Sequence, residues 1–394
     1  MKYLFVLLFL VGCGGSDDKT NKEILPPIIT VSDRLHVASW YSLPYWDHNG
    51  FPKYSGGLST YTAKHIPVAV KGGSVDYYTF SDNSGGSLDI YIADTDGNKT
   101  LIRTIDGVID PHDNAVVNYW DGYIWVIAAA RGNSRIGHSY RSKNKNDISD
   151  FVKIDSGFWA YPHLWKKALL YTVYDSDNTR ELYSKNNDCD NKLVEGGHYN
   201  ISYDDGKYIH MVYNWHQDKN LDKRTNLYYM RSIDGCVWTD KDDNILNLPL
   251  SEFDNQTLIH ETVDQYTYLK DISVVNGKVS ILVVVSNSFY PDEGQRFLHK
   301  FTLDSDAIIT EVGHNYNTGA FCDGYIVTPT FGDFGYAGGN LELFDLDGHL
   351  LHDLGREHQY NYARKVFNGN GCYVSEAPSS VVNKGAYIRR MDVN

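Results

Sequence analysis

The sequence has few residues of the kinds that mark helical or cysteine-rich proteins. Among 394 residues it has 4 methionines, 11 prolines and 5 cysteines, and no two cysteines form a Cys-x-x-Cys pair. No long segment is rich in Ala, Glu, Lys and Leu, which argues against a helical fold. After the first twelve residues, no run is apolar and long enough to cross a membrane as a helix.

Positive charge is also scarce. Lys and Arg number 36 against 50 Asp and Glu, which gives a formal net charge of −14 at pH 7. Such a balance argues against a nucleic acid as partner. An anionic substrate would need Arg, Lys and His side chains clustered at its own site.

Tyrosine and glycine, in contrast, are abundant, with 31 and 34 residues. Aromatic residues favour strands, and glycines favour turns. Short apolar segments recur along the chain at even spacing with turn signals between them, a pattern typical of a sandwich, a barrel or a propeller. Whether whole units repeat decides among the three.

A unit of roughly 45 residues repeats seven times. Each unit has an inner strand, a turn with Gly, a strongly apolar second strand and a third strand with an aromatic or apolar anchor. The third strands begin at or near Leu88, Gly137, Arg180, Asn226, Phe297, Asn340 and Ala386. An inner hairpin precedes each of them, and a longer interval between Tyr229 and Phe301 indicates a surface loop or an elaborated outer strand.

We therefore predict an all-β fold, a seven-bladed β-propeller of four-stranded antiparallel blades, over residues 28–394. The segment 28–40 is expected to supply the outermost strand of the last blade, which closes the ring and leaves no exposed edge. No blade can bury both of its faces alone, so separate domains inside this region are not expected.

The first twelve residues have a charged start and a short apolar core, as a secretory signal has. They are followed by Cys13 in a context that resembles a bacterial lipoprotein processing box. We expect residues 1–12 to be a signal peptide and residues 13–27 to be a flexible tether from lipidated Cys13. This predicts an exported lipoprotein at the outer membrane or cell surface, or secreted; the alternative is a plain signal peptide with an incidental cysteine.

The four remaining cysteines are widely spaced. An exported location permits disulfides, and four cysteines allow three pairings, among which the sequence does not choose. A zinc site that uses one or two of them with a histidine is the alternative. The cysteines concerned are Cys189, Cys236, Cys322 and Cys372.

In a propeller, residues at the starts of the inner strands converge on one face near the central axis, and the ends of the second strands join them. The segment from Asp110 to Asn133 reads as one inner hairpin around an Asp121-Gly122 turn. Aromatic rings that stack on sugars, with His, Asn and Arg for hydroxyl and acid groups, predict a carbohydrate site at this face. For each residue alone, a solvated loop position beside the channel is the alternative. The expected substrate-binding residues are Asn114, Arg131, Asn133, Tyr161, His163, His198, His216, Tyr268, Tyr316 and Tyr360.

These side chains do not suit a hydrolase. A glycosidase needs two carboxylates at a set separation, and only Asp110, Asp113 and Asp271 are scattered candidates. A Gly-x-Ser-x-Gly nucleophile motif is missing. His, Tyr and Arg suit removal of the C5 proton of a uronic acid with elimination of the 4-O-linked sugar, because a cation neutralises the carboxylate while an acid and a base move protons.

Five stretches of the sequence together point to a known family. They are Asp110-Pro-His-Asp-Asn-Ala, Asp121-Gly-Tyr-Ile-Trp-Val, Tyr140-Arg-Ser, Tyr161-Pro-His and Tyr228-Tyr-Met-Arg-Ser-Ile-Asp-Gly-Cys-Val-Trp. These stretches resemble the BNR-repeat propellers that include the ulvan lyases, polysaccharide lyase families 24 and 25. The resemblance is clear over residues 100–240 and extends further by architecture. It implies a seven-bladed propeller with a canyon on one face that cleaves ulvan between 3-sulfated rhamnose and glucuronic or iduronic acid by β-elimination, leaving a 4,5-unsaturated uronate end.

The resemblance also implies catalytic residues. The leading histidine of the family corresponds to His112, its catalytic tyrosine to Tyr199 and its carboxylate-neutralising arginine to Arg224. Tyr208 and Tyr213 compete with Tyr199 if the register differs.

Other family features are only partly matched. Asn133 lies near the place of a second family histidine; it can hydrogen-bond a carboxylate but cannot act as an acid or base. No cofactor is expected for the chemistry, whereas some members of the family bind a structural metal ion, zinc or calcium, whose ligands the sequence does not identify.

Two other functions stay open. A sialidase-like hydrolase would need three arginines, a nucleophilic tyrosine and an acid, and its Asp-box motif occurs once in degenerate form, at Ser232–Trp238. A non-catalytic propeller on the cell surface would only bind glycan. We expect an ulvan-degrading monomer.

Overall fold

The structure is a computed structural model. It describes the following residues: 27–33, 35–38, 41–46, 52–55, 57–58, 64–83, 85–108, 110–128, 131–175, 179–197, 199–216, 219–220, 223–251, 256–287, 296–303, 306–310, 319–329, 339–354, 358–378 and 386–393. The predicted signal peptide, Cys13 and the predicted tether as far as residue 26 lie outside these residues. No helix in the described parts is long and apolar enough to cross a membrane.

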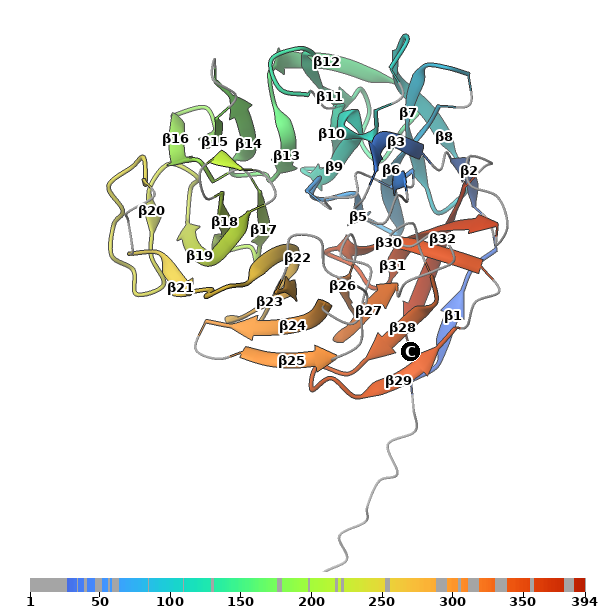
Figure 1. The fold of residues 1–394 in the computed structure, drawn as a ribbon. Helices are drawn as coiled ribbons and strands as arrows, with labels where there is room; N and C mark the ends of the chain where they lie inside the picture. The colour runs from blue at the N-terminus through green and yellow to red at the C-terminus, as the bar shows by residue number, and fades with distance from the viewer. Residues whose placement is uncertain are drawn as a thin grey trace, which may run out of the picture.

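Within the described residues, antiparallel strands form seven blades around a central axis (Figure 1), which confirms the predicted propeller. The strands of blades 1 to 4 are β5 (Ala69–Gly72), β6 (Val75–Asp82), β7 (Leu88–Asp94) and β8 (Lys99–Ile105); β9 (Ala115–Trp120), β10 (Tyr123–Ala128), β11 (Gly137–Ser142) and β12 (Phe151–Gly157); β13 (Ala160–Leu164), β14 (Leu169–Tyr174), β15 (Arg180–Lys185) and β16 (Asp190–Glu195); β17 (Asn200–Asp204), β18 (Ile209–His216), β19 (Arg224–Ser232) and β20 (Trp238–Thr239).

The strands of blades 5 to 7 follow in the same order. They are β22 (Tyr266–Val275), β23 (Lys278–Ser286), β24 (Arg296–Thr302) and β25 (Asp306–Thr310); β26 (Ala320–Cys322), β27 (Tyr325–Pro329), β28 (Leu341–Phe344) and β29 (Leu350–Asp353); β30 (His358–Phe367), β31 (Cys372–Pro378) and β32 (Ala386–Val393). Outside the blades are a hairpin of β3 (Tyr41–Trp46) and β4 (Pro52–Ser55), and a 3-10 turn, η1 (Pro111–Asp113).

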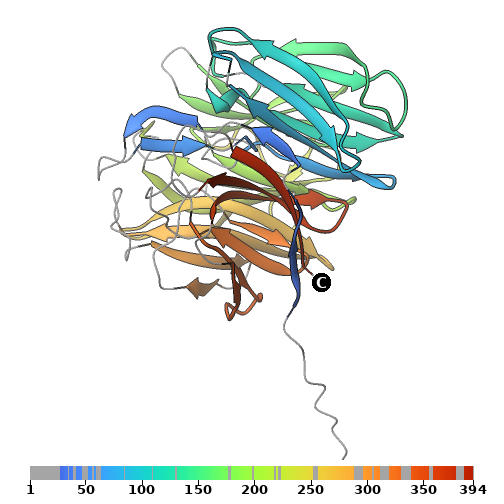
Figure 2. The same ribbon diagram turned by 90° about the vertical axis from the view of Figure 1, so that its right-hand side faces the viewer.

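The N-terminal segment closes the ring. Strands β1 (Ile29–Val31) and β2 (His36–Ala38) both pair antiparallel with β32, with Ile29 opposite Val393 and His36 opposite Ile388. Figure 2 shows this segment alongside the C-terminal strands. The prediction that the segment 28–40 completes the last blade is therefore confirmed, and an edge that would otherwise invite aggregation is covered.

The inner hairpins have apolar second strands, and six of the seven turn through residues with positive φ; the turn between β13 and β14 in blade 3 is the exception. In blade 2, Asp121 and Gly122 have φ of 57° and 87°, and they connect Trp120 to Tyr123 as a tight hairpin requires. Ile124 and Val126 on β10 are fully buried in the main core, which extends across neighbouring blades. Packing between blades thus supplies the burial that one blade lacks.

The long fourth unit elaborates an outer strand, as the sequence allowed. Besides β20, a short strand β21 (Leu258–His260) pairs with β19, with Leu227 opposite His260. The insertion therefore adds to the outside of blade 4. Residues 252–255 and 288–295 of this interval lie outside the described residues.

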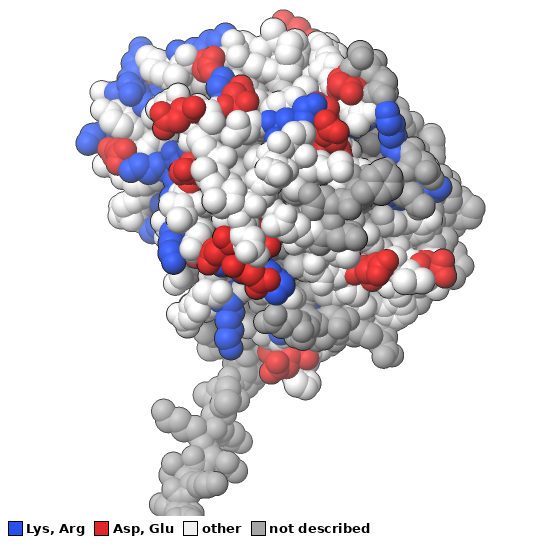
Figure 3. Space-filling view, turned by 90° about the vertical axis from the view of Figure 1, so that its left-hand side faces the viewer, with Lys and Arg blue, Asp and Glu red and all other residues white. Residues whose placement is uncertain are grey.

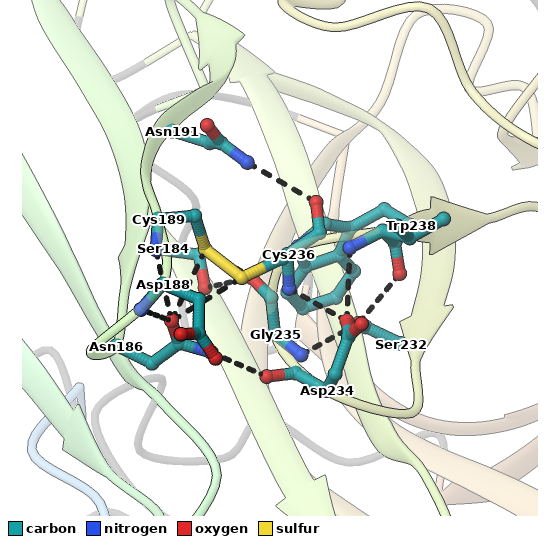
Figure 4. Close-up of a disulfide and its surroundings, with 11 residues drawn as sticks. Ser184, Asn186, Asp188, Cys189, Asn191, Ser232, Asp234, Gly235, Cys236 and Trp238 are labelled. Carbon is teal, nitrogen blue, oxygen red and sulfur yellow. Dashed lines mark hydrogen bonds between the residues drawn. A yellow bond between two sulfur atoms is a disulfide. The ribbon is translucent and has the colours of Figure 1, made fainter.

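The cysteines pair between neighbouring blades. Cys189 bonds Cys236, which connects the β15–β16 turn of blade 3 to the β19–β20 turn of blade 4 (Figure 4), and Cys322 bonds Cys372 between blades 6 and 7. This chooses one of the three pairings. The alternative of a zinc site on these cysteines is wrong, because their sulfur atoms bond each other.

The degenerate Asp box folds as a turn and not as a site. The Asp234 carboxylate accepts hydrogen bonds from the backbone N–H of Cys236 and Val237 at 2.8 and 2.9 Å, and the Trp238 indole donates to the Gly235 carbonyl at 3.1 Å. Trp238 is only 1% exposed. The motif therefore stabilises the blade.

The first disulfide is expected to stabilise the protein without affecting the inner face. Cys189 and Cys236 are 47 residues apart, so loss of their cross-link is expected to cost about 2 to 4 kcal/mol through the entropy of the unfolded chain. Urea unfolding of the double variant Cys189→Ser, Cys236→Ser measures this. An unchanged free energy of unfolding would contradict it. A reducing agent cleaves both disulfides, so wild type and variant compared under reduction should unfold alike, which controls for the substitutions themselves.

Candidate active site

The proposed catalytic residues lie at one end of their blades. His112 is in η1, just before the inner strand β9, and Tyr199 directly precedes the inner strand β17. His216 ends β18, and Arg224 begins β19 opposite it in the antiparallel ladder. Strand direction therefore places these side chains at the same face of the propeller, although they come from distant parts of the chain.

Tyr161 connects the histidine of blade 2 to the tyrosine of blade 4. Its ring lies 5.8 Å from the His112 ring and 5.6 Å from the Tyr199 ring between centroids, edge-on to both. His216 extends the row, with its ring 5.3 Å from that of Tyr199. The backbone of Tyr161 has φ of 49°, a conformation that is uncommon for a bulky residue and is often found at functional sites.

His112 is held in one tautomer by a carboxylate. Its Nδ1 lies 2.5 Å from Asp110 Oδ1, and Asp110 is also paired with Arg131 and with Arg135. Because those arginines keep Asp110 ionised, Nδ1 donates and the lone pair is on Nε2. Burial lowers the pKa of His112 to about 4, although the charge of Asp113 opposes this, so the imidazole is neutral at pH 7.

Arg224 lies over two aromatic rings. Its guanidinium carbon is 4.3 Å from the centre of the Tyr199 ring and 5.0 Å from that of Tyr268. These cation–π contacts keep the planar guanidinium beside the Tyr199 phenol. A carboxylate bound by Arg224 would therefore lie next to this phenol.

The interior around these residues is strongly basic, although the protein is acidic. Lys64 and Lys270 are 2% and 3% exposed, and the pKa of each is well below its usual value, first because of burial and then because of neighbouring cations that include Arg224 and Arg364. The nearby carboxylate of Asp271 is bound by Lys365 at 2.9 Å. On the outer side that carries β15, β16, β20 and β21, by contrast, acidic and basic side chains are interspersed (Figure 3). An anion would be attracted to the interior cluster.

A short segment through the centre holds this cluster in place. Lys64 donates from Nζ to the Leu269 carbonyl at 2.8 Å, and His65 Nε2 lies 3.2 Å from the His112 carbonyl. Further along, the Pro67 carbonyl accepts a hydrogen bond from the Val117 N–H at 2.9 Å. The segment 64–68 thus connects blades 2 and 5 near the axis and supports the backbone of His112.

Some predicted substrate-binding residues have structural partners. The amide of Asn114 donates to the Gly57 carbonyl at 3.4 Å, and its Oδ1 has no hydrogen-bond partner in the described structure. Arg131 pairs with Asp110, and exposed Asn133 donates to the Tyr174 carbonyl. These residues order the entrance beside His112, and the Asn114 oxygen is suited to accept a hydrogen bond from a sugar hydroxyl.

Two predicted binding residues belong to the core instead. His163 is 0% exposed; its Nδ1 lies 2.7 Å from Ser202 Oγ and its Nε2 lies 3.1 Å from the Lys64 carbonyl, so both nitrogens are engaged. Tyr360 packs in the apolar cluster between blades 6 and 7. Both side chains are buried, at 0% and 5% exposure. His198 and Tyr316 lie outside the described residues.

The geometry favours Tyr199 over the two other tyrosines. Tyr213 is 2% exposed and shares a hydrogen bond of 2.8 Å with Thr257, and Tyr208 lies at the β17–β18 turn, at the other end of the blade. Tyr199 is the one of the three that contacts the row of site residues.

Sequence reasoning missed Lys64, His65, Lys270 and Arg296 as parts of this region. The first two precede the inner segment of blade 1, as His112 does in blade 2. Arg296 begins a third strand, as Arg224 does in the previous blade. For these residues the repeated position was a visible signal. Lys270, whose Nζ lies 5.9 Å from the centre of the Tyr268 ring, is at a shift in the β22–β23 register, which a period of two does not predict.

Burial of neutral histidines is expected to make the protein sensitive to acid. Burial lowers the pKa of His65, His112, His163 and His216, to about 4 for His112 and about 3 for His163. The unfolded chain, with pKa near 6.5, then binds more protons below that pH, so stability is complete above pH 6.5 and falls toward pH 4. We expect about 1.4 kcal/mol per pH unit for each histidine. Urea unfolding from pH 7 to 4 measures the slope, and a flat profile would contradict this.

Among the described residues, no group of three or more His, Cys, Asp or Glu side chains is arranged to hold a metal ion.

Comparison with known proteins gives likeness in fold. No protein-family model matches the chain, and no curated protein matches it. Among solved structures, an ulvan lyase of polysaccharide lyase family PL25 covers 91% of this chain and 95% of its own, with a TM-score of 0.62 and 13% identity. The same type of enzyme bound to -[GlcA(1-4)Rha3S]- covers 88% and 95%, with a TM-score of 0.60 and 13% identity. The polysaccharide lyase Uly1 covers 94% and 100%, with a TM-score of 0.61 and 10% identity. The resemblance to ulvan-lyase propellers inferred from sequence is thereby confirmed for the fold over nearly the whole chain.

Proposed function

We propose that this chain is a polysaccharide lyase that cleaves ulvan between 3-sulfated rhamnose and glucuronic or iduronic acid. The observation that carries the proposal is the contact of His112 and Tyr199 with one ring, that of Tyr161, beside the guanidinium of Arg224. A base, an acid and a carboxylate-binding cation are the three parts that β-elimination from a uronate requires. The fold shared with ulvan lyases supports the same reaction.

Charge supports an acidic substrate. The net charge of −14 repels a polyanion at long range, but Lys64, Lys270, Arg224 and Arg364 gather in the interior. The arginines stay charged when buried, and in a medium of low dielectric they interact more strongly with an anion than they do in water. The uronate carboxylate is expected to occupy this region, with Arg224 as its bidentate partner.

The reaction breaks the C5–H and C4–O bonds of the uronate and forms a C4–C5 double bond. Arg224 would stabilise the negative charge that develops on the carboxylate when C5 loses its proton. His112 is the base in this proposal, because it is neutral at pH 7 and its Nε2 has the lone pair. The phenol of Tyr199 would donate a proton to the departing oxygen of the next sugar.

Incubation of the purified chain with ulvan tests the proposal. We expect absorbance near 235 nm to rise as the unsaturated uronate forms, and the new end to show an alkene proton by NMR. Cleavage without that absorbance would identify a hydrolase, and binding without cleavage would identify a glycan-binding propeller. Either result would contradict the lyase.

A sialidase-like hydrolase is the second candidate, and one observation favours it. Arg224, Arg296 and Arg364 all lie close enough to Lys270 to lower its pKa, so three arginines share one region with Tyr199. A sialidase also needs a carboxylic acid, however. Of the described carboxylates near this region, Asp110 is bound by arginines and Asp271 by Lys365. Release of a free sialic acid would favour this alternative over the lyase.

Attachment to the outer membrane through lipidated Cys13 remains part of the proposal. A Cys13→Ser variant expressed in a bacterium is expected to leave the membrane fraction while the wild type stays in it. Retention of the variant in that fraction would contradict lipid anchoring.

A further inference from the structure

A pocket lies between blades 2 and 3. Its volume is about 370 Å³, within the range of small-molecule pockets. It is lined by Trp120 at the end of β9, by Trp159 before β13, by the β13–β14 turn and by the β15–β16 turn. None of His112, Tyr161, Tyr199 and Arg224 lines it, so this pocket is distinct from the candidate active site.

One wall of the pocket is aromatic. The rings of Trp120 and Trp125 stack with centroids 4.8 Å apart and planes at 13°, and both are only partly buried. Trp159 packs closely against Gly157, where an added Cβ would meet its ring at 2.5 Å. A rigid tryptophan platform with an open edge is a suitable surface for the apolar face of a sugar ring.

The rim of the pocket carries two lysines whose ion-pair partners a ligand can replace. Lys166 is 58% exposed and pairs with Asp121 at 2.9 Å, and Lys185 is 36% exposed and pairs with Asp155 at 3.5 Å. Exposed ion pairs of this kind contribute about 0 to 1 kcal/mol, so a ligand carboxylate or sulfate can replace either aspartate. Lys185 also lies 5.7 Å above the Trp159 ring, which places its charge at the aromatic wall.

We propose that this pocket is an accessory site that binds an anionic saccharide segment, with the tryptophans stacking on the sugar and Lys166 and Lys185 binding its acid groups. The inference rests on the proposed function for the identity of the polymer, which is the same uronate- and sulfate-bearing chain. A polymer held there stays near the enzyme between cleavage events, because a second contact raises its effective concentration at the active site.

Native gel electrophoresis of the full chain in gels that contain ulvan tests the site. All variants carry His112→Ala, so that the polymer is not cut. Adding Trp120→Ala, or Lys166→Glu with Lys185→Glu, is expected to weaken retardation about fivefold, as loss of one of two linked contacts does. The charge-matched control is Lys143→Glu with Lys241→Glu, two exposed lysines outside the pocket, and it is expected to weaken retardation far less.

Activity assays complete the test. With His112 intact, the pocket variants are expected to raise KM for polymeric ulvan about fivefold and to leave kcat/KM for a short oligosaccharide unchanged. Equal retardation of pocket and control variants, no retardation of the parent protein, or equal retardation in a neutral glucan gel would overturn the accessory site. If the pocket substitutions weaken retardation in the ulvan gel but the chain with His112 intact forms no product at 235 nm, the proposed lyase activity is wrong and the accessory binding site is supported.

Discussion

A His112→Ala variant is expected to lose about 10²- to 10⁴-fold in kcat/KM on ulvan, the usual effect of removing a general base. Of the described neighbours, His65 is buried against the His112 carbonyl and Arg131 is paired with Asp110, so neither is placed to act in place of the His112 Nε2. The loss is expected in kcat more than in KM, since proton transfer occurs in the transition state. Initial rates at 235 nm across a range of ulvan concentrations measure both parameters.

A histidine elsewhere in blade 2 gives the control. His138 on β11 is only partly buried, and its Nδ1 lies 3.3 Å from the Tyr140 hydroxyl, far along the chain from η1. His138→Ala is expected to retain nearly wild-type turnover. If His112→Ala is equally active while it remains folded by circular dichroism, the histidine has no part in the reaction.

The pH dependence distinguishes a base from an acid at His112. Burial lowers the pKa of His112 to about 4 in the enzyme without substrate. If His112 is the base, it is neutral and active at pH 7, and kcat/KM falls only as the pH drops through about 4. A protonated acid with this pKa would be active only below that pH. Measuring kcat/KM between pH 7 and 4 therefore decides whether His112 is the base or the acid. Each sample must still be folded, since the same histidines destabilise the fold in acid.

A Tyr199→Phe variant is expected to lose about 10²- to 10⁴-fold in kcat while substrate binding changes little. The substitution removes the phenol oxygen and keeps the ring, so the edge contacts to Tyr161 and His216 and the position under Arg224 are preserved. The loss therefore reports proton donation to the departing oxygen. The measurement is kcat at 235 nm at saturating ulvan.

The matched control is the tyrosine that the sequence left as a rival. Tyr213→Phe removes a hydrogen bond to Thr257 and is expected to cost about 1 kcal/mol of stability with little change in kcat. If Tyr213→Phe reduced turnover and Tyr199→Phe did not, the register of the family resemblance would be wrong, and Tyr213 would take the place of Tyr199 as the proton donor.

The fold was predictable because its signals are local. The Asp121-Gly122 turn recurs in similar form in the other units except blade 3, and such turns, like the buried alternation of β10, need only neighbouring residues to be recognised. The anchors of the third strands gave the number of blades. Ring closure by residues 29–31 followed from the general need to cover a strand edge.

The site was only partly predictable, because the fate of a polar residue depends on distant partners. His163 occupies the same kind of position as His112, yet Ser202 and the Lys64 carbonyl, 39 and 99 residues away, satisfy both of its nitrogens. Disulfide pairing likewise depends on which blade turns become neighbours. Hairpin patterns specify the face a side chain reaches, and three-dimensional packing decides whether it stays available there.

The central claim is that imidazole, phenol and guanidinium groups from different blades act on one carbon of a sugar acid. A crystal structure of the Tyr199→Phe variant with an ulvan tetrasaccharide tests it most directly. We expect the uronate carboxylate against Arg224 and its C5 within about 3 to 3.5 Å of His112 Nε2. A tetrasaccharide whose uronate carbon lies away from His112, with its carboxylate bound by other side chains, would contradict the claim.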